Sequence, residues 1–121
     1  MRRLITVIAA FLCIGAAAQQ NVGFRQGNLK SPVVNEDNTV TFTVNAPAAS
    51  KVEVFGDWAV GYGYGLMEKN SDGLWTFTTP VLPSEMYTYR VIIDGVIGLD
   101  PLNPFTCRDV GTVFSIFYVN G

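Results

Sequence analysis

Two aspartates that flank one predicted loop are the side chains best suited to catalysis. Asp94 and Asp100 lie at either end of the segment Gly95–Leu99. Two carboxyl groups held at a suitable separation can act as the acid and base of a glycosidase. However, Asp94 precedes Gly95 and Asp100 precedes Pro101, and aspartate before glycine or proline is ordinary turn chemistry. Turn placement therefore explains both residues without catalysis.

The remaining side chains with catalytic or metal-binding chemistry are few. The chain contains no histidine, so the Ser-His-Asp and Cys-His arrangements are excluded. Cys107 is the only cysteine outside the first eighteen residues, which is too few for a thiolate zinc site. Oxygen ligands for calcium could come from Asp94, Asp100, Asn103 and Asp109, but their spacing matches no calcium loop. We therefore predict no catalytic residue, no metal and no cofactor.

A cluster of aromatic residues in a glycine-rich stretch is the strongest candidate for binding. Trp58, Tyr62 and Tyr64 lie within the segment FGDWAVGYGYG, whose glycine content predicts a loop rather than a strand. Aromatic faces on a rigid scaffold are suited to stacking on the apolar faces of sugar rings. The alternative is that Trp58 folds back to cover one end of the core, with the two tyrosines partly exposed. The sequence leaves both alternatives open.

The N-terminus has the pattern of a secretory signal. Two arginines precede an apolar run and then small alanines, which predicts a signal peptide at residues 1–18 and a secreted or periplasmic protein with no membrane anchor after cleavage. The remaining chain is acidic, with its lysines and arginines scattered. Because nucleic-acid binding needs clustered basic residues, we exclude a nucleic-acid partner.

The rest of the chain has the periodicity of strands. Residues 19–31 show no apolar period and predict a flexible leader, so the domain is expected at residues 32–121. Apolar and polar residues alternate in several short segments separated by turn residues, a pattern typical of a β-sandwich. Strands are predicted at residues 33–34, 39–45, 51–55, 74–78, 86–93 and 112–119. We therefore expect an all-β, immunoglobulin-like sandwich of about seven antiparallel strands.

Two details refine this prediction. Tyr87 follows a Leu-Pro corner at the start of a long strand, as in a tyrosine corner, where the hydroxyl bonds back to the backbone; a plain core tyrosine is the alternative. In the last predicted strand Val113, Phe117 and Val119 can face the core. Phe114, Ile116 and Tyr118 would then face outward and form a docking face for a missing partner, unless loops cover them.

These segments resemble a known family. FGDW, DGLWTFTTPVLP, YTYRVIIDG and LDPLNP, in this order, are similar to early-set immunoglobulin-like domains related to carbohydrate-binding module family 48. That family includes glycogen-binding domains of AMP-activated kinase β subunits and N-terminal domains of glucan branching and debranching enzymes. The segment TVTFTVNAPAASKVEVFGDW most resembles the N-terminal domain of secreted feruloyl and acetyl-xylan esterases. The resemblance covers residues 31–121.

The resemblance implies a non-catalytic accessory module of a secreted carbohydrate-active esterase. Val96-Ile97 stands where glycogen-binding members have tryptophan, and Phe114-Ser115 where they have asparagine, whereas Arg90 matches their basic residue. The expected partner is thus plant cell-wall polysaccharide rather than α-glucan, contacted by Trp58, Tyr62, Tyr64 and Arg90, and Trp58→Ala should weaken retention on xylan. Two alternatives remain: a structural domain packed against an α/β-hydrolase esterase domain, and a glycogen- or starch-binding module.

Overall fold

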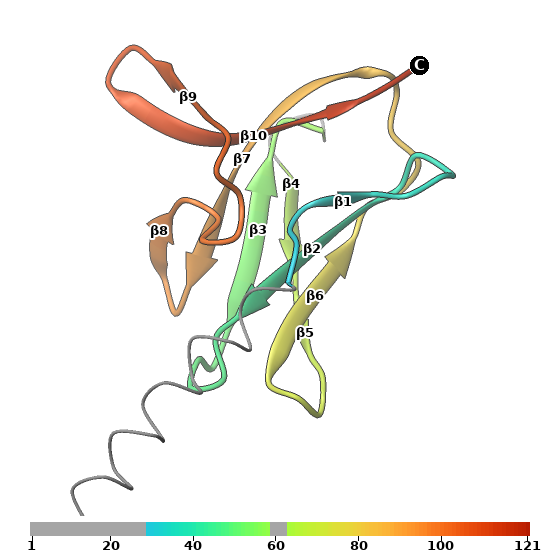
Figure 1. Ribbon diagram of the computed structural model, residues 1–121. Coiled ribbons are helices and arrows are strands. Elements are labelled where there is room, and N and C mark those ends of the chain that lie inside the picture. Colours follow the sequence, from blue (N-terminus) through green and yellow to red (C-terminus); the bar gives the residue numbers. More distant parts are fainter. Residues whose placement is uncertain (1–28, 59–62) are drawn as a thin grey trace, which may run out of the picture.

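The chain folds into two antiparallel β-sheets that face each other (Figure 1). The structure is a computed structural model that describes residues 29–58 and 63–121. One sheet has the strand order β1-β2-β6-β5, and the other has the order β4-β3-β7-β10-β9, with β8 also paired to β7. The strands are β1 (Val33–Val34), β2 (Val40–Asn45), β3 (Val52–Gly56), β4 (Gly63–Leu66), β5 (Glu68–Lys69), β6 (Leu74–Thr78), β7 (Glu85–Ile93), β8 (Val96–Gly98), β9 (Thr106–Asp109) and β10 (Thr112–Val119).

This architecture confirms the predicted all-β sandwich, with ten strands rather than about seven. The strands not predicted are β4, β5, β8 and β9, each of two to four residues. Strands this short carry too few residues for alternation to be recognised in the sequence. The described residues contain no helix, and therefore none that could cross a membrane.

The core is built by the alternation that predicted the strands. In β2, Val40, Phe42 and Val44 are buried, while the threonines between them are half-buried on the other face. From the opposite sheet, residues of β3, β7 and β10 close the core: Val52, Val54, Tyr87, Tyr89, Val91, Phe117 and Val119. Aliphatic and aromatic side chains thus fill the space between the sheets without a disulfide among the described residues.

The prediction that the glycine-rich stretch is entirely a loop is wrong for Gly63–Leu66. These residues form β4, which pairs with β3 from Gly56↔Gly63 to Glu53↔Leu66. The reason lies in packing: a Cβ added to Gly65 would lie 2.7 Å from the ring of Phe77 on the opposite sheet. Glycine is therefore required here for close approach of the two sheets, although it usually weakens a strand.

The details predicted for the end of the chain are largely confirmed. The Tyr87 hydroxyl donates a hydrogen bond of 2.8 Å to the carbonyl oxygen of Pro83, as a tyrosine corner requires. In β10, Phe117 and Val119 are buried as expected, but Val113 is only half-buried. Ser115, which the alternation also places inward, is fully buried. Its burial reflects a polar cluster described below.

The signal peptide and most of the expected leader lie outside the described residues. Ser31, the last residue of that leader, is buried and its hydroxyl donates a 2.7 Å hydrogen bond to the Asp100 carboxyl group. The folded part of the chain thus includes Ser31, one residue before the predicted start of the domain at residue 32.

Candidate functional site

Trp58 turns inward from the end of β3 and packs against the core. Its ring stacks on Phe42, with centroids 5.2 Å apart and an interplanar angle of 29°. It also lies 6.4 Å from the Tyr89 ring and 6.3 Å from the Phe117 ring. A Cβ at Gly56 would overlap the Trp58 ring, so glycine at this position leaves the space that the indole fills. The structure therefore places Trp58 as the second alternative describes, covering one end of the core.

The other predicted stacking residues are not placed together with Trp58. Tyr62 lies outside the described residues. Tyr64 is in β4 and is 64% exposed, and its ring lies 5.0 Å from the ring of Phe55, the residue opposite it in β3. Tyr64 thus stands on the outer face of the six-stranded sheet, supported by a neighbouring aromatic ring.

This outer face carries a row of side chains that crosses four strands. Phe55 is opposite Tyr64 in β4 on one side and opposite Arg90 in β7 on the other. Directly opposed residues in antiparallel strands project from the same face. The Arg90 guanidinium in turn lies 5.0 Å from the centroid of the Phe114 ring in β10. These four side chains, in their order across the sheet, are hereafter called the outer row: Tyr64, Phe55, Arg90 and Phe114.

Arg90 is held in the outer row by stacking rather than by ion pairing. Among the described residues the one ion pair within 4.0 Å joins Lys51 to Glu53, and Arg90 takes no part in it. Its Nε atom is buried and has no hydrogen-bond partner. A guanidinium over an aromatic face is stabilised by the ring quadrupole, and its terminal nitrogens are hydrogen-bond donors. The outer row therefore combines aromatic faces with a cation that forms no ion pair in the part of the chain that the structure describes.

The loop that leads out of β3 is fixed to β7 beside this row. The Asp57 carboxyl group accepts hydrogen bonds from the Thr88 amide and hydroxyl, both 3.0 Å long. The Asp57 amide donates back to the Thr88 carbonyl at 3.2 Å. These bonds fix the backbone immediately before Trp58, where the chain leaves the sheet.

The residues predicted as a docking face lie on the same side of β10. Phe114 belongs to the outer row and is half-buried, Ile116 is half-buried, and Tyr118 is 59% exposed. Further exposed apolar residues stand at two hairpins, Val96 and Ile97 in β8 and Val110 between β9 and β10. The structure thus brings together Tyr64, Arg90 and the docking face on one sheet, and places Trp58 elsewhere.

A buried polar cluster was missed by the sequence analysis. Asp100 is 2% exposed and accepts hydrogen bonds of 2.7 Å from the hydroxyls of both Ser31 and Tyr89. Asn103 donates to the Tyr89 hydroxyl at 3.0 Å, and Ser115 accepts from the Asp100 amide at 3.0 Å. The cluster joins the start of the fold to β7, the loop before β9, and β10.

The hydrogen bonds within this cluster indicate a structural role for it. Its hydroxyl and amide groups bond to one another, and Asp94, the other half of the carboxylate pair considered above, is exposed and accepts from the Ser50 and Lys51 amides. In the parts of the chain that the structure describes, no three acidic, cysteine or histidine side chains come together as a metal site would need. Asp94 is thus a turn residue, whereas Asp100 connects segments that are far apart in the sequence by hydrogen bonds.

Because of this cluster, the free energy of unfolding should decrease at alkaline pH. Burial raises the pKa of the Tyr89 hydroxyl, and the neighbouring Asp100 adds to this rise. Below the ordinary tyrosine pKa of about 10 both folded and unfolded states hold the proton; above it only the unfolded state releases it. Stability should therefore fall above about pH 10, by up to about 1.4 kcal/mol per pH unit for this group. Urea unfolding at increasing pH measures the slope, and Tyr89→Phe should reduce it; equal slopes would contradict this assignment.

Comparisons with known proteins support the fold. No family model matches the chain, and no curated protein matches it. A group B streptococcal (GBS) pullulanase in complex with maltotetraose is 23% identical, with a TM-score of 0.58 over 78% of this chain and 14% of that one. The catalytic module of the glycogen-degrading pneumococcal virulence factor SpuA is 21% identical, with a TM-score of 0.59 over 76% and 16%. An Anoxybacillus pullulanase with maltotetraose is 22% identical, with a TM-score of 0.57 over 74% and 14%. This chain thus matches about one seventh of each neighbour, and the likeness establishes a shared fold.

Proposed function

We propose that this chain is a non-catalytic carbohydrate-binding module and that the outer row binds an α-glucan. The observation that carries the proposal is the row itself, which places on one face of a sheet an exposed tyrosine and an arginine that has no ion pair among the described residues. Aromatic rings suit the apolar faces of sugars, and guanidinium donors suit their hydroxyl groups. Because neighbouring strands are about 4.8 Å apart, the row extends over roughly 14 Å, which favours a chain of sugars over a single ring.

The ligand class rests on the structural neighbours. Two of the three solved structures hold maltotetraose, and the third is described as glycogen-degrading. None of the three is an esterase, so they favour the glycogen- or starch-binding alternative over plant cell-wall polysaccharide. The esterase partner domain and secretion remain predictions from the sequence alone.

Tyr64→Ala tests the proposed site with little risk to the fold. Because the Tyr64 side chain is mostly exposed, its loss should change stability by no more than about 0.5 kcal/mol. Loss of a stacking face worth about 1 kcal/mol should weaken glucan binding roughly fivefold. Affinity electrophoresis in gels containing glycogen measures this effect directly.

The controls decide between ligand classes. Val81 lies between β6 and β7, outside the outer row, and is 65% exposed, so Val81→Ala removes exposed apolar surface at another position and should migrate like the wild type. Gels containing xylan test the plant polysaccharide. Retention by xylan alone would favour the esterase context, and equal retention of Tyr64→Ala and wild type in glycogen would refute the outer row as the binding surface.

A further inference from the structure

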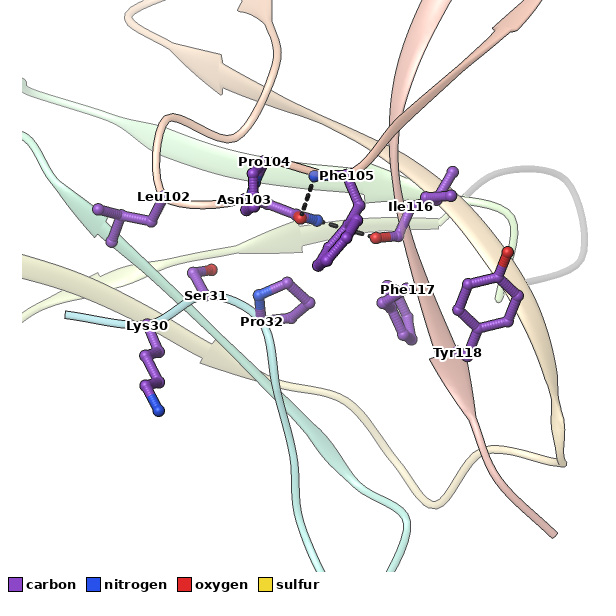
Figure 2. A pocket seen from close by; sticks show the side chains of 10 residues that line it. All are labelled: Lys30, Ser31, Pro32, Leu102, Asn103, Pro104, Phe105, Ile116, Phe117 and Tyr118. Carbon is purple, nitrogen blue, oxygen red and sulfur yellow. Dashed lines mark hydrogen bonds between the residues drawn. The ribbon is translucent and has the colours of Figure 1, made fainter. Parts of the chain in front are cut away.

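A cavity of about 400 Å³ opens at the edge of the sandwich (Figure 2), and neither Tyr64 nor Arg90 lines it. Three separate segments form it: Lys30–Pro32 at the start of the fold, residues 102–105 before β9, and residues 116–118 of β10. The Phe105 ring projects into it opposite Pro32, and Tyr118 stands at its far side (Figure 2). Phe105 is 68% exposed, which is a large apolar exposure for a phenylalanine at a cavity.

The Ser31 and Asn103 side chains, which line this cavity, are already engaged with the protein. The Ser31 hydroxyl donates to Asp100 and accepts from the Thr43 amide. Both amide hydrogens of Asn103 are used, one by the Tyr89 hydroxyl and one by the carbonyl of Ile116 at 2.9 Å. Apart from Lys30 and the Tyr118 hydroxyl, the side chains of the cavity therefore offer mainly apolar contact, which is unsuited to a hydroxyl-rich sugar.

Hydrogen bonds are instead available from the backbone of β10. Its pairing with β9 ends at Ser115↔Thr106, and the Ile116 amide then donates to the Phe105 carbonyl at 3.1 Å. Because alternate residues of a strand direct their backbone groups to opposite sides, the amide and carbonyl of Tyr118 lie on the same edge as those of Ile116. Within residues 29–58 and 63–121 the pairing with β9 stops before Tyr118, and neither group bonds to the backbone of a turn or loop. The edge of β10 beside the cavity is thus unpaired.

An unpaired strand edge next to an apolar cavity has the two features of a β-strand-addition site. The edge supplies main-chain hydrogen bonds, and the cavity accepts a side chain that alternates toward it. Proteins normally cover or charge such an edge, because it otherwise pairs with other chains. Lys30, at the rim, is exposed and has no ion-pair partner among the described residues.

We propose that the edge of β10 at Tyr118 binds an extended peptide segment of a partner protein by β-strand addition. An aromatic or branched aliphatic side chain of that segment fills the cavity between Phe105 and Pro32, and an acidic residue next to it pairs with Lys30. The occupant is a peptide rather than a small molecule, because the available hydrogen-bonding groups are backbone groups in strand geometry. The outer row lines no part of this cavity, so the proposal stands independently of glucan binding.

The test uses the chain purified after export from a bacterial host and a short blocked peptide. The peptide alternates threonine with apolar residues, carries a central phenylalanine, and has glutamate at both ends. Its control has proline in place of each threonine and so cannot pair with a strand edge. We expect the first peptide to bind and to protect the Tyr118 amide from hydrogen exchange at least about tenfold, and the control to do neither.

Three variants locate the binding. Tyr118→Pro removes an amide that the fold does not use, and proline is tolerated at an edge strand. The affinity for the peptide should fall at least about tenfold, because a main-chain hydrogen bond is lost and strand pairing is blocked. Tyr118→Thr keeps the amide and should lose no more than about threefold. Phe105→Ser removes a wall of the cavity and should also cost about tenfold. Circular dichroism verifies that each variant is folded.

Several outcomes would overturn the proposal. Unchanged affinity in both Tyr118→Pro and Phe105→Ser places the peptide elsewhere, and equal binding of the proline control excludes strand addition even where a variant does not fold. A Tyr118 amide protected before any peptide is added shows that the edge is already covered. Protection independent of protein concentration then assigns it to this chain's own residues, and protection that rises with concentration assigns it to a second copy.

Discussion

Replacing Trp58 by alanine should lower the free energy of unfolding by about 3 kcal/mol, the lower end of the usual cost of removing a large aromatic side chain from a packed site, because Trp58 is half-buried. The indole stacks on Phe42 and lies close to Tyr89 and Phe117, so its removal opens a void against three core rings. For a domain of about 100 residues this loss corresponds to a fall in melting temperature of more than about 10 °C.

Thermal and urea unfolding measure this effect, with Trp58→Phe and Tyr64→Ala as matched variants. Phenylalanine keeps a ring against Phe42 and should recover part of the stability, while Tyr64→Ala changes an exposed ring on the outer sheet face and should leave the melting temperature nearly unchanged. A Trp58→Ala variant with unaltered stability and lost polysaccharide retention would contradict this packing role and would restore Trp58 as a sugar-stacking residue. Retention on xylan or glycogen is therefore interpretable only alongside unfolding data.

The position of Trp58 shows where sequence-based prediction of this fold ends. Alternation predicted β6 and β10 at their observed bounds, because a half-buried strand repeats every two residues. A residue just beyond a strand has no such period, and its direction is set by contacts far away in the chain. The one local signal was Gly56, whose missing side chain leaves room for the indole.

Three of the four members of the outer row were predicted from the sequence, but Phe55 and the arrangement of the row were not. Tyr64, Arg90 and Phe114 were each singled out, yet their alignment depends on the register of β4, β3, β7 and β10. Register is set by long-range pairing that one sequence does not reveal. The glycine content of residues 61–65 also concealed β4, because close approach to Phe77 requires glycine where propensity disfavours it.

The polar cluster was not predicted, because turn chemistry alone explained Asp100 in the sequence. Aspartate before proline is common in turns, and Asp100 does accept a hydrogen bond from the Leu102 amide, at 3.0 Å. Its second carboxyl oxygen, however, bonds to Ser31 and Tyr89, which lie 69 and 11 residues away in sequence. No pattern in the sequence connects these three positions, so only the fold reveals the cluster.

Asp100→Ala should therefore cost about 3–4 kcal/mol of stability. It deprives three donors of their acceptor, the hydroxyls of Ser31 and Tyr89 and the Leu102 amide. A buried donor left unpaired costs about 1–3 kcal/mol, and relief from burying the carboxyl group offsets part of the sum. Asp100→Asn keeps the shape and one acceptor oxygen, so it should cost roughly half as much.

Urea unfolding at neutral pH tests this expectation, with Asp94→Ala as the matched control. Asp94 also accepts two hydrogen bonds, from the Ser50 and Lys51 amides, but it is exposed, so water can replace its oxygens and the loss should be near 1 kcal/mol. Equal losses at the two aspartates would mean that water reaches the cluster. A larger loss at Asp100 would establish that this carboxyl group holds the start of the fold, at Ser31, against Tyr89 of β7.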